Sequence, residues 1–427
     1  MDNIEIDHER MIFTRNGHPF FYLADTAWMA FSNIELTQWR EYLRFRRRQG
    51  FTVVQISILP VLNDTGTGPE TLYPYAIEAD GKMNFQKRNN TYFERAEAMV
   101  KMVIEEGLVP ALVVLWNNYI PTSWASVHIK DISNVSVEFL PEYAGIVAKY
   151  FGKYNPFLLI SGDTMFENDV VCEYYKTLYS EVRKQCPSSL ITMHLAPDIE
   201  MPADVCGMDG IDFYMYQSGH QEKQVQYAYT LAEKFNTYPI KRPIVNGEPC
   251  YEGHVCCDRE AVRYSAADVR RAIWQSLLSG AKAGVTYGAH GIWMFYQEGM
   301  SFNNRSFSGS PFLWRDAIEF PGAWDAAYSK ILFDNLNLYD IWPRQSLIPD
   351  APAGVRAAAD EKNGLVAVYS PYAEEFMLEL DLSGYKTEMI RLDNRRYVNP
   401  TLVISEGKTC VKMAGCNSDS LFLARKL

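Results

Sequence analysis

Residues 246–254, Asn-Gly-Glu-Pro-Cys-Tyr-Glu-Gly-His, place an acidic side chain directly after a short apolar segment. Ile244 and Val245 follow a proline, which predicts a short buried strand that ends at Glu248. Gly247 allows an unusual backbone angle beside Glu248, and Pro249 removes a backbone donor and ends the ladder. A carboxylate there points into whatever lies above the strand end. An exposed acidic turn is the alternative interpretation of this stretch alone.

Other chemically useful side chains follow predicted strands in the same way, and Asp163 comes soon after the apolar run 157–160. Glycoside hydrolysis needs two carboxyl groups, one to protonate the leaving oxygen and one to attack or to activate water. Asp163 and Glu248 are therefore the candidate catalytic pair. Trp and Tyr rings offer stacking faces to a sugar, while Asn, Gln and His offer contacts to its hydroxyl groups. The candidate substrate-binding residues are Asp25, Trp28, Trp116, Asn117, His194, Gln217, His220, Tyr251, Glu252, His290 and Trp293.

Other hydrolytic chemistries have weaker support in the sequence. No HExxH or HxH motif is present, although His194, His220 and His290 could converge on a metal ion. A serine nucleophile lacks its GxSxG motif. Cys250 has His254 nearby, but its acidic neighbours do not favour a thiolate. A single histidine is more often structural than catalytic, so the shared position at strand ends carries the hypothesis. We expect neither a metal nor a cofactor in the chemistry.

The elements that must position these residues alternate along the first part of the chain. Apolar runs predict strands at 20–24, 52–58, 108–115, 157–160, 190–193, 210–215, 242–245 and 285–287. Most are separated by predicted helices, at 36–49, 92–106, 137–151, 170–185, 221–235 and 264–278. Eight alternating strands predict a (β/α)8 TIM barrel, whose active site forms at the carboxyl ends of the strands. The fifth connection lacks a clear helix. A doubly wound open sheet is the alternative fold, but its usual GxGxxG signature is absent from the sequence. The long loop 59–90 is expected to shape the site.

The pattern changes from about residue 342. Short alternating apolar runs separated by Gly, Asn and Pro predict a small C-terminal antiparallel β-sandwich, and residues 1–14 can supply an extra strand. We therefore divide the chain into a barrel catalytic domain, residues 1–340, and a β-sandwich domain, residues 341–427.

The composition of the chain limits the kinds of molecule that it can bind. The chain of 427 residues has a formal net charge of -11, which disfavours nucleic acid. Its densest basic run, at Arg44 and Arg46–Arg48, is expected to be a solvated helix end. The eight cysteines show no CxxC spacing, the N-terminus does not resemble a signal peptide, and no apolar run is long enough to span a membrane. These features indicate a reduced, cytoplasmic protein with no membrane partner; the oligomeric state is not determined.

Five ordered segments resemble the apiosidase-like glycoside hydrolases, which are barrels followed by a small domain labelled as collagen-binding. The segments are Phe-Tyr-Leu-Ala-Asp-Thr-Ala-Trp (21–28), Arg-Arg-Gln-Gly-Phe-Thr-Val-Val-Gln (47–55), Lys-Tyr-Asn-Pro (153–156) leading to Gly162-Asp163, Asn-Gly-Glu-Pro (246–249) with Tyr-Glu-Gly (251–253), and Gly-Ala-His-Gly-Ile-Trp (288–293).

The resemblance implies a glycosidase that acts on a glycan or oligosaccharide, with Asp163 as acid/base and Glu248 as nucleophile. It also implies that Asp25, Trp28, His290 and Trp293 line the sugar site. Two segments depart from the family pattern: Leu-Ile-Ser-Gly-Asp at 159–163, where Gly-Gly-Asp is usual, and Arg-Leu-Asp-Asn-Arg at 391–395. We therefore do not carry over specificity for apiose. Retention of configuration is the favoured outcome, and a carbohydrate-binding protein without turnover is the alternative.

Overall fold

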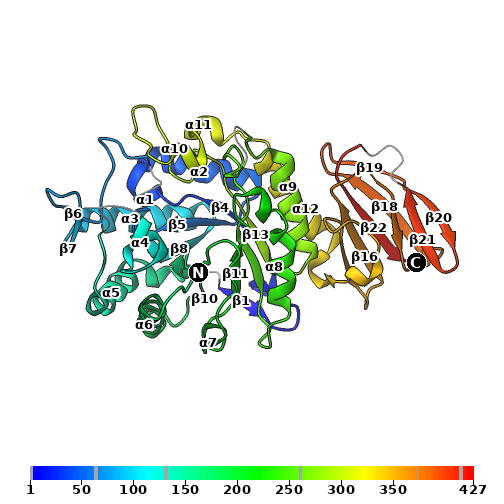
Figure 1. The fold of residues 1–427 in the computed structure, drawn as a ribbon, viewed down its shortest axis with the longest axis horizontal. Helices are drawn as coiled ribbons and strands as arrows, with labels where there is room; N and C mark the ends of the chain where they lie inside the picture. The colour runs from blue at the N-terminus through cyan, green and yellow to red at the C-terminus, as the bar shows by residue number, and fades with distance from the viewer. Residues whose placement is uncertain (1–2, 62–65, 129–132, 259–261, 373, 413–416) are drawn as a thin grey trace.

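The computed structural model describes residues 3–61, 66–128, 133–258, 262–372, 374–412 and 417–427. It confirms the predicted TIM barrel with antiparallel β-sheets after it (Figure 1). Eight parallel strands form one sheet in the order β10-β9-β8-β5-β4-β13-β12-β11. They are β4 (Tyr22–Thr26), β5 (Val53–Ser57), β8 (Val109–Trp116), β9 (Phe157–Gly162), β10 (Ile191–Thr192), β11 (Tyr214–Gln217), β12 (Ile244–Glu248) and β13 (Gly284–Tyr287).

The barrel is nearly closed, and its seam lies between β10 and β11. There the Asp212 backbone N–H donates to the carbonyl of Ile191 (2.8 Å), and the Thr192 hydroxyl donates to the carbonyl of Phe213 (2.6 Å). The weak fifth connection of the sequence corresponds to the four-residue helix α7 (Ala203–Cys206). The sixth strand starts later than predicted, at Tyr214, because Asp212 is used in joining the seam.

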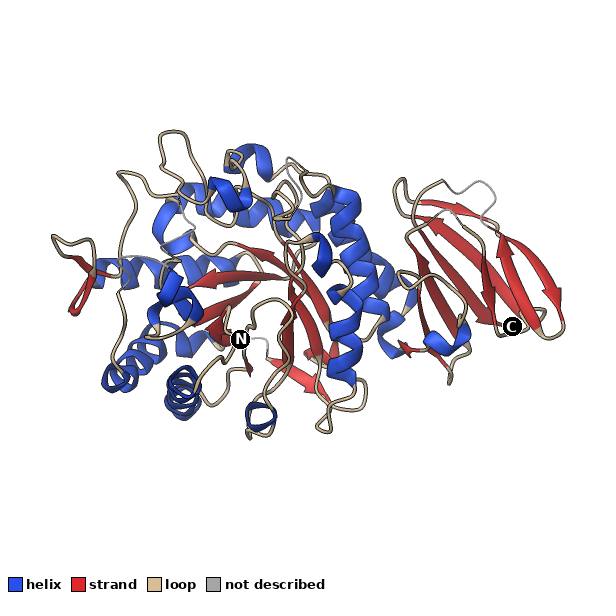
Figure 2. Cartoon of the chain, in the orientation of Figure 1, coloured by secondary structure: helices blue, strands red, loops and turns tan. Residues whose placement is uncertain are grey.

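Helices surround the barrel at the six predicted positions, although the fifth starts at Tyr227 rather than at residue 221, and the long helix Gly322–Leu336 was not predicted (Figure 2). Asn89 and Asn168 cap two of them by accepting hydrogen bonds from the backbone N–H groups of Tyr92 and Val171. The long helices are α2 (Leu36–Gln49), α3 (Asn90–Glu105), α5 (Leu140–Phe151), α6 (Asp169–Gln185), α8 (Tyr227–Asn236), α9 (Ala266–Leu278) and α12 (Gly322–Leu336). Short helices are α1 (Ala30–Asn33), α4 (Trp124–His128), α10 (Arg305–Ser308) and α11 (Trp314–Ala317). The 3-10 turns are η1 (Asn117–Tyr119), η2 (Val137–Phe139), η3 (Gly152–Tyr154), η4 (Glu222–Gln224), η5 (Leu338–Asp340) and η6 (Gln345–Leu347).

The N-terminal segment closes the bottom of the barrel. Strands β1 (Ile4–Asp7), β2 (Ile12–Arg15) and β3 (His18–Phe20) form a small antiparallel sheet. From it, the Phe13 ring packs edge-on against Phe157 and Phe213, at 5.2 Å each. The barrel interior is thus filled at this end, and any site must lie at the other. The long loop at 59–90 carries a hairpin of β6 (Tyr75–Ile77) and β7 (Met83–Arg88); its residues 62–65 lie outside the described part.

The C-terminal region contains two antiparallel sheets. The larger runs β14-β15-β16-β22-β18-β19 and the smaller runs β17-β21-β20. The strands are β14 (Trp342–Pro343), β15 (Arg356–Asp360), β16 (Leu365–Ser370), β17 (Phe376–Leu378), β18 (Tyr385–Arg391), β19 (Arg396–Val398), β20 (Thr401–Ser405), β21 (Lys408–Lys412) and β22 (Ser420–Lys426). The division at residues 340/341 stays a prediction; α12 ends before it and β14 begins after it.

The larger C-terminal sheet is buried on both faces in its centre. Val366 and Val368 of β16 join the core shared with the smaller sheet, while Ala367 and Tyr369 join the core of the barrel. The Tyr369 ring stacks on Trp274 of α9 (6.4 Å, 18°). This explains why β16 reads as a continuous apolar run rather than an alternating one. Within the described residues, no helix is both long and apolar enough to cross a bilayer.

Candidate active site

A cavity of about 290 Å³ opens at the carboxyl ends of the barrel strands. It brings together most of the residues that were predicted from strand ends, although they are far apart in the sequence. The predicted residues that line it are Trp28, Trp116, Asp163, Gln217, His220, Glu248, Tyr251 and Trp293. Asp25, Asn117, His194, Glu252 and His290 do not line it.

Glu248 is aimed by an irregularity in its strand. Tyr216 pairs with Asn246 and Gln217 with Glu248, so Gly247 is an extra residue in β12. Such a bulge re-aims the side chain that follows it. The sequence-based reason for Gly247 was wrong, because its backbone does not lie in the left-handed region. A Cβ atom there would instead lie 2.4 Å from the Met215 side chain, so glycine is needed for space.

Asp163 lies on the turn that follows β9. Its backbone is left-handed (φ 51°), a conformation that a non-glycine residue adopts only where surrounding contacts hold it. Two such contacts reach its carbonyl oxygen, from Asn117 Nδ2 (3.2 Å) and Trp124 Nε1 (2.8 Å). Asn117, predicted as a substrate ligand, therefore holds this turn.

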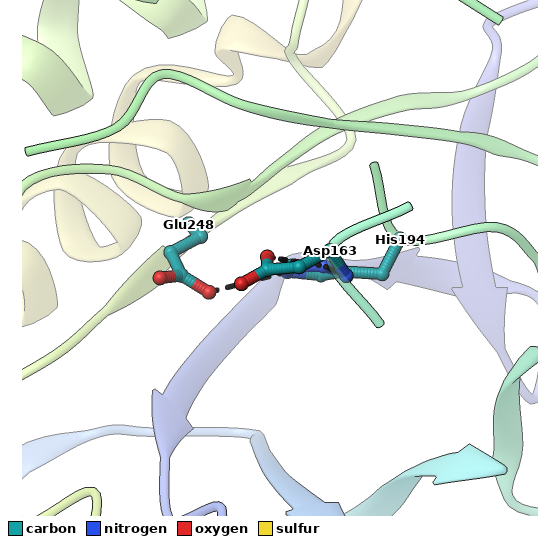
Figure 3. Close-up of side chains that lie close together, drawn as sticks. All are labelled: Asp163, His194 and Glu248. Atoms are coloured by element: carbon teal, nitrogen blue, oxygen red, sulfur yellow. Dashed lines mark hydrogen bonds and ion pairs between the residues drawn. The ribbon is translucent and has the colours of Figure 1, made fainter. Parts of the chain in front are cut away.

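His194 is fully buried and contacts both acids (Figure 3). Its Nε2 is 3.3 Å from Glu248 Oε2, and its Nδ1 is 3.6 Å from Asp163 Oδ1. The Asp163 backbone N–H also approaches Nδ1 (3.4 Å). This contact favours the tautomer in which Nε2 carries the hydrogen and faces Glu248 Oε2. One oxygen of Asp163 and one of Glu248 lie within 4.8 Å of each other.

The charge state of Glu248 is set by two imidazoles. His220 Nε2 lies 2.9 Å from Glu248 Oε1, so each oxygen of this carboxylate has a histidine nitrogen beside it. Burial by itself raises the pKa of Glu248, but the hydrogen bonds from His194 and His220 outweigh it and lower that pKa to about 2. Glu248 is therefore ionised at neutral pH.

Aromatic rings form much of the cavity wall. Trp28 Nε1 donates to the Tyr251 hydroxyl (3.1 Å), and the Trp28 and Trp116 rings meet edge-to-face at 5.3 Å. Two glycines make room for these rings: a Cβ atom on Gly162 would lie 2.5 Å from the Trp116 ring, and one on Gly288 would lie 2.1 Å from Tyr251.

A row of histidine rings runs away from Glu248. The His254 ring stacks on His220 (4.6 Å, 21°), and His290 follows it at 5.1 Å. Burial lowers the pKa of His290 to about 4 and that of His254 well below its usual range, so both are neutral at pH 7. His290 receives the Trp293 indole N–H (3.3 Å) and contacts the carbonyl of Gly309 (3.0 Å). It thus supports Trp293 from behind, and the three histidines considered as metal ligands do not converge.

Asp25 and Glu252 lie behind the barrel wall, which corrects their placement at the sugar site. Asp25 accepts hydrogen bonds from Arg46 Nε and the Tyr42 hydroxyl, both at 2.6 Å. Glu252 accepts from the Tyr287 hydroxyl (2.7 Å) and the Gly322 backbone N–H (2.9 Å). Burial raises the pKa of both carboxyl groups. Arg46 was expected to be solvated, but it is fully buried against Asp25.

Sequence reasoning missed the residues that loops contribute. They are Val61, Trp124, Met165, Pro197, Gln221, Gln224, His254, Asn304, Phe307 and Ser308. Of these, His254 was considered only as a partner of Cys250. The missed residues come from connections and short helices rather than strand ends, so the rule that found the others could not reach them. The only sequence signal was the length of the connections that follow the strands.

A sequence model of the family described as "Apiosidase-like, catalytic domain" matches residues 7–340. The chain belongs to this family. The protein is therefore a glycosidase, which confirms the class of enzyme predicted from the sequence.

Solved structures share the fold over the whole chain. A protein titled "Glycoside hydrolase" has a TM-score of 0.82 at 19% identity, covering 100% of this chain and 97% of its own. A glycoside hydrolase family 5 structure from Bacteroides vulgatus has a TM-score of 0.79 at 18% identity, covering 99% and 93%. None of the curated proteins compared matches the sequence. At these identities the structural likeness concerns the fold alone, barrel and β-sheets together.

Proposed function

We propose that the protein hydrolyses O-glycosidic bonds with retention of configuration, with Glu248 as nucleophile and Asp163 as acid/base. The observation that carries the proposal is the spacing of the two acids across the cavity. Retaining enzymes hold their carboxyl groups about 5–5.5 Å apart, whereas inverting enzymes leave roughly 6.5–9.5 Å for a water molecule. One oxygen of each acid lies within 4.8 Å of the other, and this close approach supports the first arrangement.

In the first step, a Glu248 oxygen attacks the anomeric carbon while the Asp163 carboxyl group gives its proton to the glycosidic oxygen. The bond from carbon to that oxygen breaks, and the leaving group departs as an alcohol. Two carboxylates this close repel each other, which favours a single proton on the pair. His194 and His220 keep Glu248 ionised, which leaves Asp163 as the acid that supplies the proton in this step.

In the second step, the Asp163 carboxylate takes a proton from water as the water oxygen attacks the anomeric carbon. The bond to Glu248 breaks and the carboxylate is released. The two imidazoles that face Glu248 help here, because a carboxylate of low pKa is a good leaving group. They also hold the carboxylate in one orientation, which limits the rearrangement needed in either step.

Substitution of each acid tests these roles. Glu248→Gln should abolish turnover of an activated aryl glycoside, and Asp163→Asn should slow most strongly the substrates with poor leaving groups. Azide should restore turnover of Asp163→Ala with an aryl glycoside, and proton NMR of the first product should show retention. An inverted first product would overturn the retaining mechanism, and near-normal turnover of Glu248→Gln would overturn the assignment of that residue.

A metal-dependent hydrolase is the second candidate. Asp163, His194 and Glu248 each offer a ligand atom, and these atoms lie within 4.8 Å of one another. Carboxylate and imidazole ligands suit a divalent ion. Loss of activity on dialysis against a chelator, with recovery on adding Zn²⁺ or Mn²⁺, would favour this candidate; the two-carboxylate mechanism predicts unchanged activity.

As a glycosidase, the protein has a carbohydrate substrate, and its identity beyond a glycan or oligosaccharide is not assigned. Binding without turnover is the alternative from the sequence. It predicts that the Asp163 and Glu248 variants bind the same sugars as the wild type, and that neither the variants nor the wild type hydrolyse these sugars.

We also propose that the protein acts in a reducing compartment such as the cytoplasm. The described cysteines, at positions 172, 186, 206, 250, 256, 257 and 410, are all unbridged, which supports this location.

A further inference from the structure

The cavity is closed around one catalytic acid and open around the other. The Glu248 side chain is 7% exposed, whereas that of Asp163 is 28% exposed. Under the proposed mechanism, the sugar whose anomeric carbon meets Glu248 is enclosed, and the leaving group that Asp163 protonates lies toward solvent. The exposure difference therefore gives the direction in which substrate enters.

The enclosed space suits one sugar unit. A hexosyl ring with its hydroxyl groups occupies roughly 180 Å³, the share of about six water molecules in the liquid. The cavity measures about 290 Å³, which accommodates one such ring beside Glu248.

The chemistry of the wall suits an uncharged sugar. Trp116 Nε1, Gln217 Oε1 and His220 Nδ1 are buried polar atoms of lining residues, and none has a hydrogen-bond partner among the residues that the structure describes. The lining side chains thus carry both donors and acceptors, which suits hydroxyl groups. Among the described lining residues there is no lysine or arginine, while two carboxylates are present. A uronic acid or sulfated sugar would be repelled by them without a cation to compensate.

The outer rim is apolar. Met165 and Phe307 line the cavity and remain 37% and 45% exposed, and the half-buried Trp124 lies beside Asp163 through its bond to that residue's carbonyl. Exposed apolar groups at a cavity mouth commonly mark the binding surface of a ligand. Trp124 and Met165 lie on the Asp163 side and would contact the leaving group, whereas Phe307 packs beside His254 at 6.0 Å.

We propose that the enzyme is exo-acting: it encloses a single uncharged glycosyl unit at the chain end and holds the leaving group on the apolar rim of Trp124 and Met165. This inference rests on the proposed two-carboxylate function and specifies its substrate class.

The test compares reducing-end-labelled oligosaccharides of several lengths and neutral compositions with matched chains that end in a uronic acid. The wild type should release one neutral monosaccharide at a time and leave a labelled chain one unit shorter. Its kcat/KM should be at least about 100-fold lower for the acidic chain ends. Cleavage within the chain, or equal release of the uronic acid, would overturn the inference. If Glu248→Gln does not carry out this internal cleavage or uronic acid release, the proposed two-carboxylate function stands and only the exo inference fails. Cleavage that persists in both Glu248→Gln and Asp163→Asn would overturn the proposed function instead.

The rim is tested on the monosaccharide that the first experiment identifies, as its 4-nitrophenyl and methyl glycosides. Met165→Ala should raise KM for the aryl glycoside roughly 3- to 10-fold and leave KM for the methyl glycoside nearly unchanged. Met377→Ala is the matched control, because Met377 is an exposed methionine of β17 that does not line the cavity. Equal changes for both glycosides, or no change for either, would contradict the apolar leaving-group surface.

Discussion

Asp163 and Glu248 lie in the cavity at the barrel mouth, whereas Asp25 and Glu252 lie behind the barrel wall. All four acids lie at or close to the carboxyl ends of strands. The partners of the acids differ between the two places. Asp25 faces a guanidinium group, and Glu252 faces a phenol and a backbone N–H. Glu248 faces two imidazoles and a partner acid across open space.

The difference teaches that position at a strand end does not assign a role to an acid. A guanidinium in a buried pair holds its charge permanently and fills the space around the carboxylate, so Asp25 cannot exchange protons with a ligand. Imidazoles stabilise the ionised carboxylate but leave the face toward the cavity free. We therefore expect the first pair of acids to control rate and the second to control stability.

The sharpest comparison is between Glu248→Gln and the wild type. Loss of the nucleophile should lower kcat by about 10⁴-fold or more, since residual rates in such variants come from binding alone. The melting temperature should also fall, because the amide keeps the shape of the side chain but loses the charge that the two histidines stabilise. Steady-state kinetics with an activated glycoside and thermal unfolding of both proteins measure the two quantities.

Asp25→Asn should have the largest effect on stability. It leaves the guanidinium of Arg46 buried without its charged partner, which typically costs about 3–5 kcal/mol in the free energy of unfolding. Denaturant unfolding measures this loss, and kcat at a temperature where the variant is folded should remain near normal. In the double variant Asp25→Leu/Arg46→Met, which removes both charges, the loss should be smaller. A large fall in kcat without a loss of stability would instead show that Asp25 acts at the sugar site.

Glu252→Gln is the matched partner of Glu248→Gln, because the same change is made four residues away. One amide oxygen can still accept from Tyr287 or Gly322, but the new NH₂ group then lacks an acceptor. We expect a loss of about 1–3 kcal/mol in unfolding free energy and a kcat within about tenfold of the wild type. If instead kcat falls as far as in Glu248→Gln, the two regions are not separate.

The smallest predicted effect concerns pH. The pKa of Glu248 is lowered from its ordinary 4.5 to about 2, so its ionisation stabilises the folded protein above about pH 4.5, and this contribution is lost as pH falls toward 2. His220→Ala removes one of the two lowering contacts and should shift the acid limb of kcat/KM upward by about one pH unit, which is about 1.4 kcal/mol. His220→Gln keeps a donor and should shift it less. An acid limb that does not move would show that His220 does not set the charge of Glu248.

Much of the arrangement could be predicted from the sequence. Apolar runs alternating with amphipathic helices gave the barrel, and residues placed after the runs included Trp28, Asp163 and Glu248. The reasoning failed where a side chain's neighbours come from distant elements. Arg46 was taken as one of a solvated cluster, and Gly247 as a residue chosen for its backbone angle. Both depend on a partner, Asp25 and Met215 respectively, that only the folded chain supplies.

What the sequence by itself determined is the order of the elements, the family and the presence of two acids at the same end of the barrel. Hydrophobic periodicity and strand-end positions carry that information because they are local. The tertiary structure decided which acids face the cavity, that His194 and His220 flank Glu248, and that loop residues such as Met165 form the rim. These are contacts between segments far apart in the chain, and the packing of the helices and loops, which no local pattern encodes, brings them together.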